Sequence, residues 1–330
     1  MIEDISDESG FVGVVLLADS SGIIFHKAFG RGKNAPDTTT AFWIASNTKP
    51  MTAQAILSLQ AQGLLSVNDS LHKFFLDAPP NKRAITIEHL LTHTSGLPSD
   101  NIAEGVPERE RAVRLMLSQK LIAPPSKEFH YANDGYSLLA AIIEIVSKER
   151  YEDVMQKVIL MPCGMNQSGF WGLEQNTNVR IDAINDSAKY YPFYAKIFRN
   201  GKPFEDWAHK GATGVFCTSG NLYRWLYSLR SGASLDSLAT KSLFQPRIVV
   251  DSSSESAVLS YGYGWAVVKV RGKTTEIRHR GRGDWMHNNS VYLLPNGYIL
   301  IAWAKDNGPN APAWSTEVCK RVITALHHNI

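Results

Sequence analysis

The pair Ser46 and Lys49 is the arrangement in this chain best suited to covalent chemistry. A serine hydroxyl is a weak nucleophile at neutral pH and needs a neighbouring base to take its proton. Periodic apolar residues after Pro50 predict a helix that begins near Asn47, so a lysine three positions after the serine lies on the same helix face. Free N–H groups at such a helix start favour developing negative charge. Alone, the same pattern also fits a helix cap beside a solvated lysine.

Tyr131 and Asn133 form a second arrangement, 85 residues after Ser46 and just before a predicted helix from Tyr136. A tyrosine hydroxyl can pass a proton, and an asparagine amide can hydrogen-bond a substrate and an amine at the same time. The proline-rich segment 124–126 indicates a loop before them. A half-buried aromatic ring and a helix cap would be the ordinary explanation of the same two residues.

The third arrangement is His279-Arg280-Gly281, at the end of a strand predicted over 274–279. A glycine on an edge strand lets a substrate backbone approach closely. The N–H group that follows Gly281 can then pair with that of Ser46 to stabilise an oxyanion. In isolation, an exposed basic strand end with a bend glycine explains these residues more simply.

Periodic and turn signals place these residues in an α+β arrangement. Two apolar strands open the chain and a four-strand meander precedes a closing helix, so we expect one antiparallel sheet built from both termini and flanked by helices. The middle of the chain is predicted to be a mainly helical insertion, with a cleft at the junction. We therefore expect one catalytic unit with a sheet region at 1–65 and 210–330 and an inserted helical region at 66–209. The strands are predicted at Phe11–Ala18, Ile23–Phe29, Tyr263–Val270, Thr274–His279, Ser290–Leu294 and Tyr298–Ala304, and the helices after the Ser46 segment at Thr86–Leu91, Glu108–Leu121, Tyr136–Lys148 and Thr316–His327.

Composition excludes several function classes. The 330 residues are 44% hydrophobic and 20% charged with a net charge of +3, which is typical of a globular protein without a nucleic-acid or acidic-membrane surface. Three widely spaced cysteines indicate neither a disulfide framework nor a zinc ribbon. The first ten residues lack the composition of a signal peptide, and no apolar run reaches transmembrane length. We expect a cytoplasmic protein, or a periplasmic one if a leader has been removed.

Together, the three arrangements resemble the serine β-lactamase and penicillin-binding-protein superfamily, in particular its class C-like branch related to esterases and D-Ala-D-Ala carboxypeptidases. In that superfamily a Ser-x-x-Lys box precedes a Tyr-x-Asn or Ser-x-Asn box, which precedes a Lys-Thr-Gly or His-x-Gly box. This chain carries all three in order, as Ser46–Lys49, Tyr131–Asn133 and His279–Gly281. The stretches Phe42–Ala45 and Leu90–Pro98 also look like the family, and the resemblance covers nearly the whole chain. It implies a β-lactamase/transpeptidase-like fold.

The resemblance implies a role for each functional residue of the first two boxes. Ser46 would be the nucleophile that forms an acyl-enzyme, and Lys49 its general base or proton relay. Lys49 would then have to be partly neutral, with a pKa lowered by burial or by neighbouring positive charge. Tyr131 would protonate the leaving group and then activate the deacylating water. Asn133 would hold Lys49 and the substrate amide.

In the third box, His279 stands where a lysine is frequent. Among the resembling proteins this replacement is common in esterases, D-amino-acid peptidases and amide hydrolases, and it is less usual in true β-lactamases. Gly281 would let the backbone approach the substrate. Arg280 and Arg282 would hold a substrate carboxylate, or they are solvated charges at a strand end. Trp285 would line the substrate pocket, or it belongs to the core.

Other segments imitate functional patterns. Segment 70–73 repeats the serine–lysine spacing without a clear helix start, segment 273–275 lacks the glycine of the third box, and segment 219–221 lies too far along the chain to be the second box. His89 and His93 have the spacing of zinc ligands on a helix, but the His-Glu-x-x-His pattern is absent. We expect no metal and no cofactor.

The resulting prediction is a serine hydrolase that cleaves a small-molecule ester, amide or D-amino-acid peptide through an acyl-enzyme on Ser46. Two alternatives stay open: a β-lactamase or D-Ala-D-Ala carboxypeptidase proper, and a non-catalytic binding protein on the same fold. We expect no nucleic-acid or membrane partner, and nothing in the sequence indicates an oligomeric state.

Overall fold

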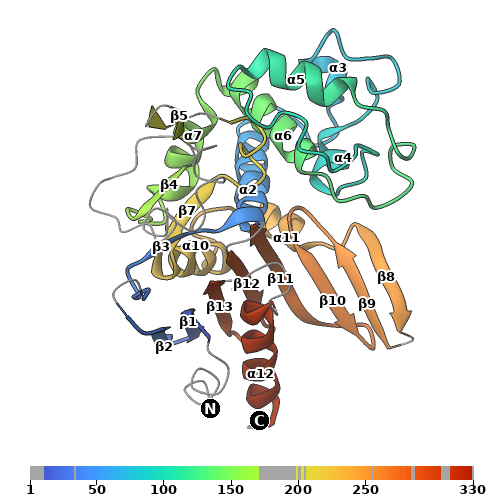
Figure 1. Cartoon of the computed structure of the whole chain (residues 1–330). Helices are drawn as coiled ribbons and strands as arrows, with labels where there is room; N and C mark the ends of the chain where they lie inside the picture. Colours follow the sequence, from blue (N-terminus) through green and yellow to red (C-terminus); the bar gives the residue numbers. More distant parts are fainter. Residues whose placement is uncertain are drawn as a thin grey trace.

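An eight-stranded antiparallel sheet underlies the molecule (Figure 1). The computed structural model describes residues 11–32, 35–170, 198–199, 202–203, 206–254, 256–283, 287–305 and 313–328. The strand order is β2-β1-β13-β12-β11-β10-β9-β8, so strands from distant parts of the chain pair in the sheet. The bounds are β1 Gly13–Asp19, β2 Gly22–Phe29, β8 Ile248–Ser254, β9 Ala257–Tyr261, β10 Ala266–Val270, β11 Lys273–Gly283, β12 His287–Leu293 and β13 Ile299–Lys305.

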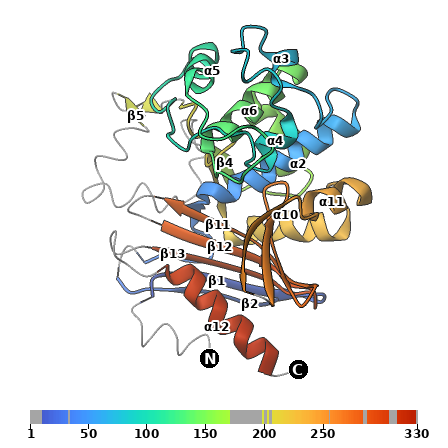
Figure 2. The same cartoon turned by 90° about the vertical axis from the view of Figure 1, so that its right-hand side faces the viewer.

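Both faces of the central strands are covered (Figure 2). β1 and β13 are buried along almost their whole length, so their sequences GVVLLAD and ILIAWAK are nearly continuous apolar runs. α12 (Trp314–His328) packs across one face against side chains such as Val15, Tyr292 and Ala302. The other helices lie on the opposite side of the sheet.

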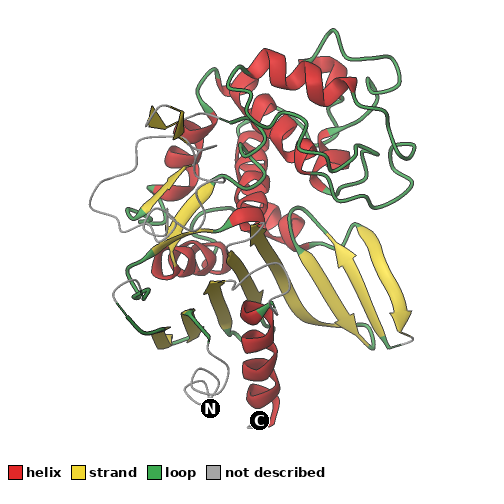
Figure 3. Cartoon of the chain, viewed as in Figure 1, coloured by secondary structure: helices red, strands yellow, loops and turns green. Residues whose placement is uncertain are grey.

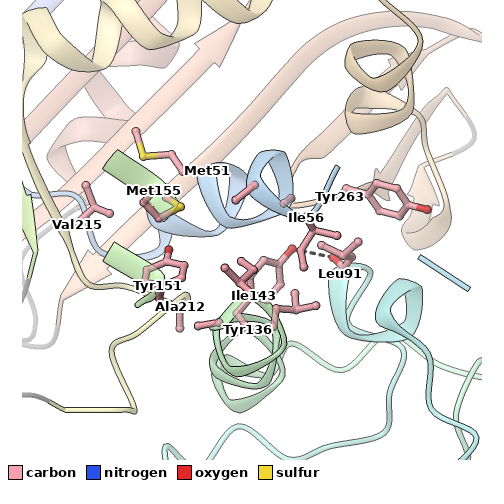
Figure 4. Close-up of a cluster of buried hydrophobic side chains, with 14 of the residues drawn as sticks. Met51, Ile56, Leu91, Tyr136, Ile143, Tyr151, Met155, Ala212, Val215 and Tyr263 are labelled. Atoms are coloured by element: carbon pink, nitrogen blue, oxygen red, sulfur yellow. Dashed lines mark hydrogen bonds between the residues drawn. The ribbon is translucent and has the colours of Figure 1, made fainter. Parts of the chain in front are cut away.

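α2 (Thr48–Ala61) runs through the centre of the helical region, and 11 of its 14 residues are buried (Figure 4). A helix enclosed in this way needs no polar face, which lets it carry Met51 and Ile56 on different sides. It packs against α6 (Asn133–Ser147), whose Tyr136 hydroxyl donates a 2.8 Å hydrogen bond to the Leu91 carbonyl. The other helices are α3 Leu71–Phe74, α4 Ile87–Leu91, α5 Arg109–Ser118, α7 Tyr151–Met155 with the π turn Gln156–Leu160, α10 Ser219–Ser231 and α11 Ser237–Phe244 (Figure 3).

A small three-stranded sheet leads the chain into α2. Its order is β3 (Ala41–Trp43), β7 (Val215–Thr218) and β4 (Ser168–Phe170), and β5 (Phe198–Arg199) pairs separately with β6 (Lys202–Pro203). After β3, the N–H of Ile44 donates to the Val215 carbonyl at 3.0 Å. The chain then forms the short 3-10 turn η1 (Ala45–Asn47) and enters α2. The start of α2 is therefore held by β7, a strand from the second half of the chain.

The predicted α+β arrangement, with a sheet built from both termini and a helical insertion, is confirmed. The meander is larger than predicted, because β8 and β9 extend its outer edge. The second half of β8 is the polar run Asp251–Ser254, which has the composition of a loop. The division into regions at residues 65 and 210 stays a prediction. Within the described residues, no helix has the length and apolar character needed to cross a lipid bilayer.

Candidate active site

Ser46 lies in the turn η1, immediately before α2. α2 begins at Thr48 with Pro50 in its first turn, which confirms the predicted helix start. Ala45 has φ of 45°, a left-handed conformation that is costly for a residue with a Cβ atom. The turn is closed by the Asn47 N–H, which donates to the Ile44 carbonyl at 3.0 Å. The Ser46 hydroxyl is thus presented on a constrained backbone at a helix N-terminus.

Lys49 is fully buried beneath Ser46. Its Nζ lies 3.1 Å from Ser46 Oγ, 2.7 Å from Asn133 Oδ1 and 3.1 Å from the Ala212 carbonyl oxygen. These partners are all neutral, and burial lowers the pKa of the Lys49 amine well below its usual value. A lowered pKa favours the unprotonated amine, which is the state that can accept the serine proton.

Tyr131 lies against both Ser46 and Lys49. Its hydroxyl hydrogen-bonds the Ser46 side chain, and its ring centroid lies 4.8 Å from Lys49 Nζ. Burial raises the pKa of the Tyr131 phenol, and the hydrogen bond to Ser46 opposes that rise. The phenol is therefore protonated in the resting site, where it is placed to donate a proton.

Asn133 is the first residue of α6 and orients its amide between two partners. Its Oδ1 faces Lys49, and its Nδ2 donates to Asn101 Oδ1 at 2.9 Å. Asn101 has φ of 48°, a left-handed conformation that asparagine tolerates better than most residues. Asn101 was not predicted as a site residue, because an asparagine in a loop is common and gives no specific signal in the sequence. Its hydrogen bond fixes which end of the Asn133 amide faces the lysine.

Gly281 lies within β11 rather than at its end, because the strand continues to Gly283. A Cβ atom at Gly281 would lie 2.2 Å from the Ile44 carbonyl oxygen and 2.7 Å from the side-chain amide of Asn289, its partner on β12. The Asn289 amide also accepts a hydrogen bond from the Asn47 side chain. The backbone of β11 therefore packs directly against the turn that carries Ser46, which only glycine permits.

His279 is buried, and because side chains alternate along a strand it lies on the same face of β11 as Gly281. Its Nε2 lies 3.1 Å from the Tyr261 hydroxyl, and its Nδ1 has no hydrogen-bond partner among the described residues. Burial, together with the charge of Lys49, lowers the pKa of His279 to about 3. The histidine is therefore neutral at pH 7 and brings no positive charge to the site.

Arg282 is exposed, and the strand pairing sends its side chain away from the other site residues. Directly opposed residues of antiparallel strands share a face, and Arg282 is opposite Asn288. Asn288 Oδ1 accepts a 2.9 Å hydrogen bond from the Ser315 N–H of α12, so this is the α12 face of the sheet. Gly281 points to the other face. The predicted carboxylate contact of Arg282 therefore has no support in the geometry, and Trp285 lies outside the described residues.

Arg280 lies on the α12 face as well. It is opposite Ser290, whose hydroxyl lies 3.0 Å from that of Ser315. Because side chains alternate along β11, Arg280 and Arg282 both lie on the face of the sheet away from Ser46.

The two histidines with zinc-ligand spacing have other partners. His89 Nδ1 accepts the Thr86 N–H in a capping box at the start of α4, and His93 Nδ1 accepts the Ala132 N–H at 3.1 Å. Among the described residues, no three acidic, histidine or cysteine side chains are grouped as metal ligands would be. The second serine–lysine pair also differs from the first, because the amine of Lys73 is exposed and pairs with Asp69 at 2.7 Å.

The beta-lactamase family model matches residues 1–316, and the chain therefore belongs to the beta-lactamase family. This confirms the family that the three boxes indicated. The chain is 25% identical over 303 residues to a penicillin-binding protein of Bacillus subtilis (strain 168), a match that covers 85% of this chain and 65% of the relative. It is 32% identical over 185 residues to protein flp of Staphylococcus aureus (strain N315), covering 52% of this chain and 36% of that protein. The chain thus spans less than two thirds of the length of these curated relatives.

Solved structures confirm the β-lactamase/transpeptidase-like fold. A D-amino acid amidase from Ochrobactrum anthropi SV3, complexed with L-phenylalanine amide, is similar with a TM-score of 0.78 and 19% identity, covering 99% of this chain and 98% of that one. A penicillin binding protein from Bacillus halodurans is similar with a TM-score of 0.75 and 22% identity, covering 98% of each chain. At these identities, the likeness establishes the fold and leaves the reaction to the geometry of the site.

Proposed function

We propose that the protein is a serine hydrolase that forms an acyl-enzyme on Ser46 and cleaves a small ester or amide. The observation that carries the proposal is the buried Lys49 amine, which lies 3.1 Å from Ser46 Oγ and has no anionic partner among its contacts. A buried lysine in a purely structural role would be expected to pair with a carboxylate. Here burial instead lowers the pKa of the amine, which favours the neutral form that can take a proton.

In the acylation step, Lys49 accepts the Ser46 proton while Oγ attacks the substrate carbonyl carbon. The carbonyl oxygen becomes an oxyanion that accepts hydrogen bonds from the backbone N–H groups of Ser46 and Arg282. The tetrahedral intermediate then collapses, and the leaving oxygen or nitrogen takes the proton of the Tyr131 hydroxyl. The tyrosine regains a proton from the Lys49 ammonium, so the site returns to its starting protonation with the acyl group on Ser46.

Deacylation follows the same path in reverse with water as the nucleophile. Water loses a proton to the pair of Lys49 and Tyr131 and attacks the acyl carbonyl. The bond from the carbonyl carbon to Ser46 Oγ breaks, and Ser46 recovers its proton. The product is a carboxylic acid, and no group outside the chain and water takes part.

The charge of the site supports a substrate without a carboxylate beside the scissile bond. His279 is neutral, and Arg280 and Arg282 lie on the far face of β11, so this strand offers the substrate side no cation. Penicillins and D-Ala-D-Ala peptides carry such a carboxylate, whereas esters and amino-acid amides do not. We therefore propose an ester or amide, including amides of D-amino acids, as the substrate class.

The experiment is covalent labelling followed by a substrate panel. A fluorophosphonate probe should label the wild type and not Ser46→Ala, while Ser70→Ala, which removes the serine of the second serine–lysine pair, should be labelled like the wild type. Equal labelling of wild type and Ser46→Ala would end the proposal. Turnover of p-nitrophenyl esters or D-amino-acid amides that is lost in Ser46→Ala would support it.

A β-lactamase or D-Ala-D-Ala carboxypeptidase is the second candidate, favoured by the match to a penicillin-binding protein. Nitrocefin hydrolysis or release of D-alanine, dependent on Ser46 and faster than ester or amide cleavage, would select it. Labelling without turnover of any substrate in the panel would favour a binding protein on this fold.

A further inference from the structure

His93 holds the backbone on both sides of Tyr131. Its carbonyl oxygen accepts the His130 N–H at 2.8 Å, and its ring Nδ1 accepts the Ala132 N–H at 3.1 Å. The two hydrogen bonds flank Tyr131, whose own ring centroid lies 4.2 Å from that of His93. One residue therefore fixes the chain before and after the tyrosine and also packs against its ring.

The backbone of His93 has an unusual conformation, which its contacts around Tyr131 help to explain. Its φ is 57°, in the left-handed region where residues with a Cβ atom are strained. Its side chain is 1% exposed and lies among aromatic rings, with centroids 5.1 Å from both Tyr136 and Tyr261. Such strain persists only where surrounding contacts impose it. Here those contacts are the two hydrogen bonds to the neighbours of Tyr131 and the packing against its ring.

The hydrogen bond from Ala132 also defines the tautomer. Because Nδ1 accepts a hydrogen bond, the single proton of the neutral ring is on Nε2, which is buried and has no partner among the described residues. A second proton on Nδ1 would face the Ala132 N–H and break the bond. Burial is the main cause that lowers the pKa of His93 well below its usual value, so the accepting form persists.

We propose that His93 is a positioning residue, whose carbonyl oxygen and Nδ1 hold residues 130–132 so that the Tyr131 hydroxyl stays aligned with Ser46. This inference rests on the proposed function, in which Tyr131 gives its proton to the leaving group. Loss of the Nδ1 acceptor leaves the Ala132 N–H buried and unpaired, and the segment shifts to satisfy it. The consequence falls on leaving-group protonation, because that step depends on the position of the phenol.

The test compares two substrates with the same acyl group. A p-nitrophenyl ester releases a phenolate that needs no proton, whereas an ethyl ester releases an alkoxide that does. The measured quantity is kcat/KM for the ethyl ester divided by kcat/KM for the p-nitrophenyl ester. This ratio cancels losses that affect both substrates equally, such as a smaller folded fraction.

Two variants separate the acceptor from the ring. His93→Phe keeps an aromatic ring against Tyr131 and removes the acceptor. We expect the ratio to fall about 10- to 100-fold, which is a partial loss of the roughly 100- to 10,000-fold that general acid catalysis contributes. His93→Asn loses the ring but keeps an acceptor near Nδ1 and tolerates a positive φ, so we expect a ratio within about threefold of the wild type. The control is His89→Phe, which removes a ring acceptor from the cap of α4, away from Tyr131, and should leave the ratio unchanged.

Thermal melts establish that each variant is folded. An unchanged ratio in His93→Phe would overturn the inference, and so would a fall in His93→Asn as large as that in His93→Phe. If His93→Phe does not fold, His93→Ala replaces it as the variant without an acceptor. Failure of the proposed function is distinct from these outcomes, because it appears as wild-type turnover that does not depend on Ser46.

Discussion

The packing of Gly281 against the Ser46 turn predicts a large loss of activity from a single added methyl group. In Gly281→Ala the new Cβ would lie 2.2 Å from the Ile44 carbonyl oxygen and 2.7 Å from the Asn289 amide. Gly281 does not have a left-handed φ, so alanine can adopt the strand backbone without strain. The substitution therefore tests the close approach of β11 to the turn, separately from glycine's conformational freedom.

The magnitude follows from the displacement that the methyl group requires. The carbonyl contact must open from 2.2 Å to an ordinary 3.4 Å, so β11 and the turn move apart by about 1.2 Å. The proposed oxyanion donors belong to these two segments, one N–H from Ser46 and one from Arg282. A misplacement of about 1 Å costs about 100-fold in rate, and loss of one oxyanion donor costs about 100- to 1,000-fold in kcat. We expect a fall of about 100-fold in kcat and a loss of about 1–3 kcal/mol in unfolding free energy from overpacking.

The assay is p-nitrophenyl ester hydrolysis with a urea denaturation curve for each protein. Gly220→Ala is the matched control, because Gly220 lies in the first turn of α10 and its Cβ would meet only Thr218 Oγ1, at 3.9 Å. This control should keep kcat within about twofold and be as stable as the wild type or slightly more stable. A folded Gly281→Ala protein with more than a third of wild-type kcat would refute the link between this contact and the oxyanion site.

Three further predictions follow from the buried polar groups. Asn101→Gly keeps the left-handed backbone but removes the acceptor for Asn133 Nδ2, so kcat/KM should fall about 5- to 10-fold, and an unchanged value would contradict the role of this hydrogen bond. The pKa of His279 is about 3 in the folded protein against 6.5 for the free side chain, so the unfolded chain takes up a proton first as pH falls, and stability is lost between pH 6.5 and 3. Between these pH values the unfolding free energy of His279→Gln should fall by up to about 1.4 kcal/mol less per pH unit than that of the wild type. Urea denaturation at each pH measures this, and an identical pH dependence of the unfolding free energy in the two proteins would disprove it. The cysteine thiols are buried with raised pKa values, so iodoacetamide should label them only in denaturant, as mass spectrometry would show; rapid labelling of the native protein would contradict their burial. These thiols are Cys163, Cys217 and Cys319.

The parts of the site that could be predicted are those with local signals. Residues three positions apart are neighbours on a helix, so the spacing of Ser46 and Lys49 predicts their contact, and Pro50 marks where that helix begins. The long apolar strands and the amphipathic helices were likewise predictable from their periods. By contrast, β8 was missed because half of it is polar, and an edge strand can be polar without loss of core contacts.

Other parts had no signal that a single sequence could provide. The Ala212 carbonyl that accepts from Lys49 is a backbone group, which every residue has. Asn101 and His93 act through contacts between loops that are distant in sequence, so their types alone suggested little. Arg282 is a different case: strand alternation already implies that residues 280 and 282 face away if His279 and Gly281 face the site. That step was available from the sequence, and applying it would have removed both arginines from the predicted site.

Half of the non-glycine residues with a left-handed backbone in the described chain lie beside the groups proposed to transfer protons. Six non-glycine residues of the described chain have a positive φ, and three of them are Ala45, His93 and Asn101. Ala45 directly precedes Ser46, and the His93 ring packs against that of Tyr131. Asn101 accepts a hydrogen bond from the side chain of Asn133. The hydroxyl of Ser46, the ring of Tyr131 and the amide of Asn133 all lie around the Lys49 amine. Burial of Lys49 without a counter-ion costs folding free energy for the same reason that it lowers the pKa, since the charged form loses its solvation. A variant that gave Lys49 a carboxylate partner would raise the pKa of the amine and, by restoring the ammonium, remove the base on which the proposed reaction depends.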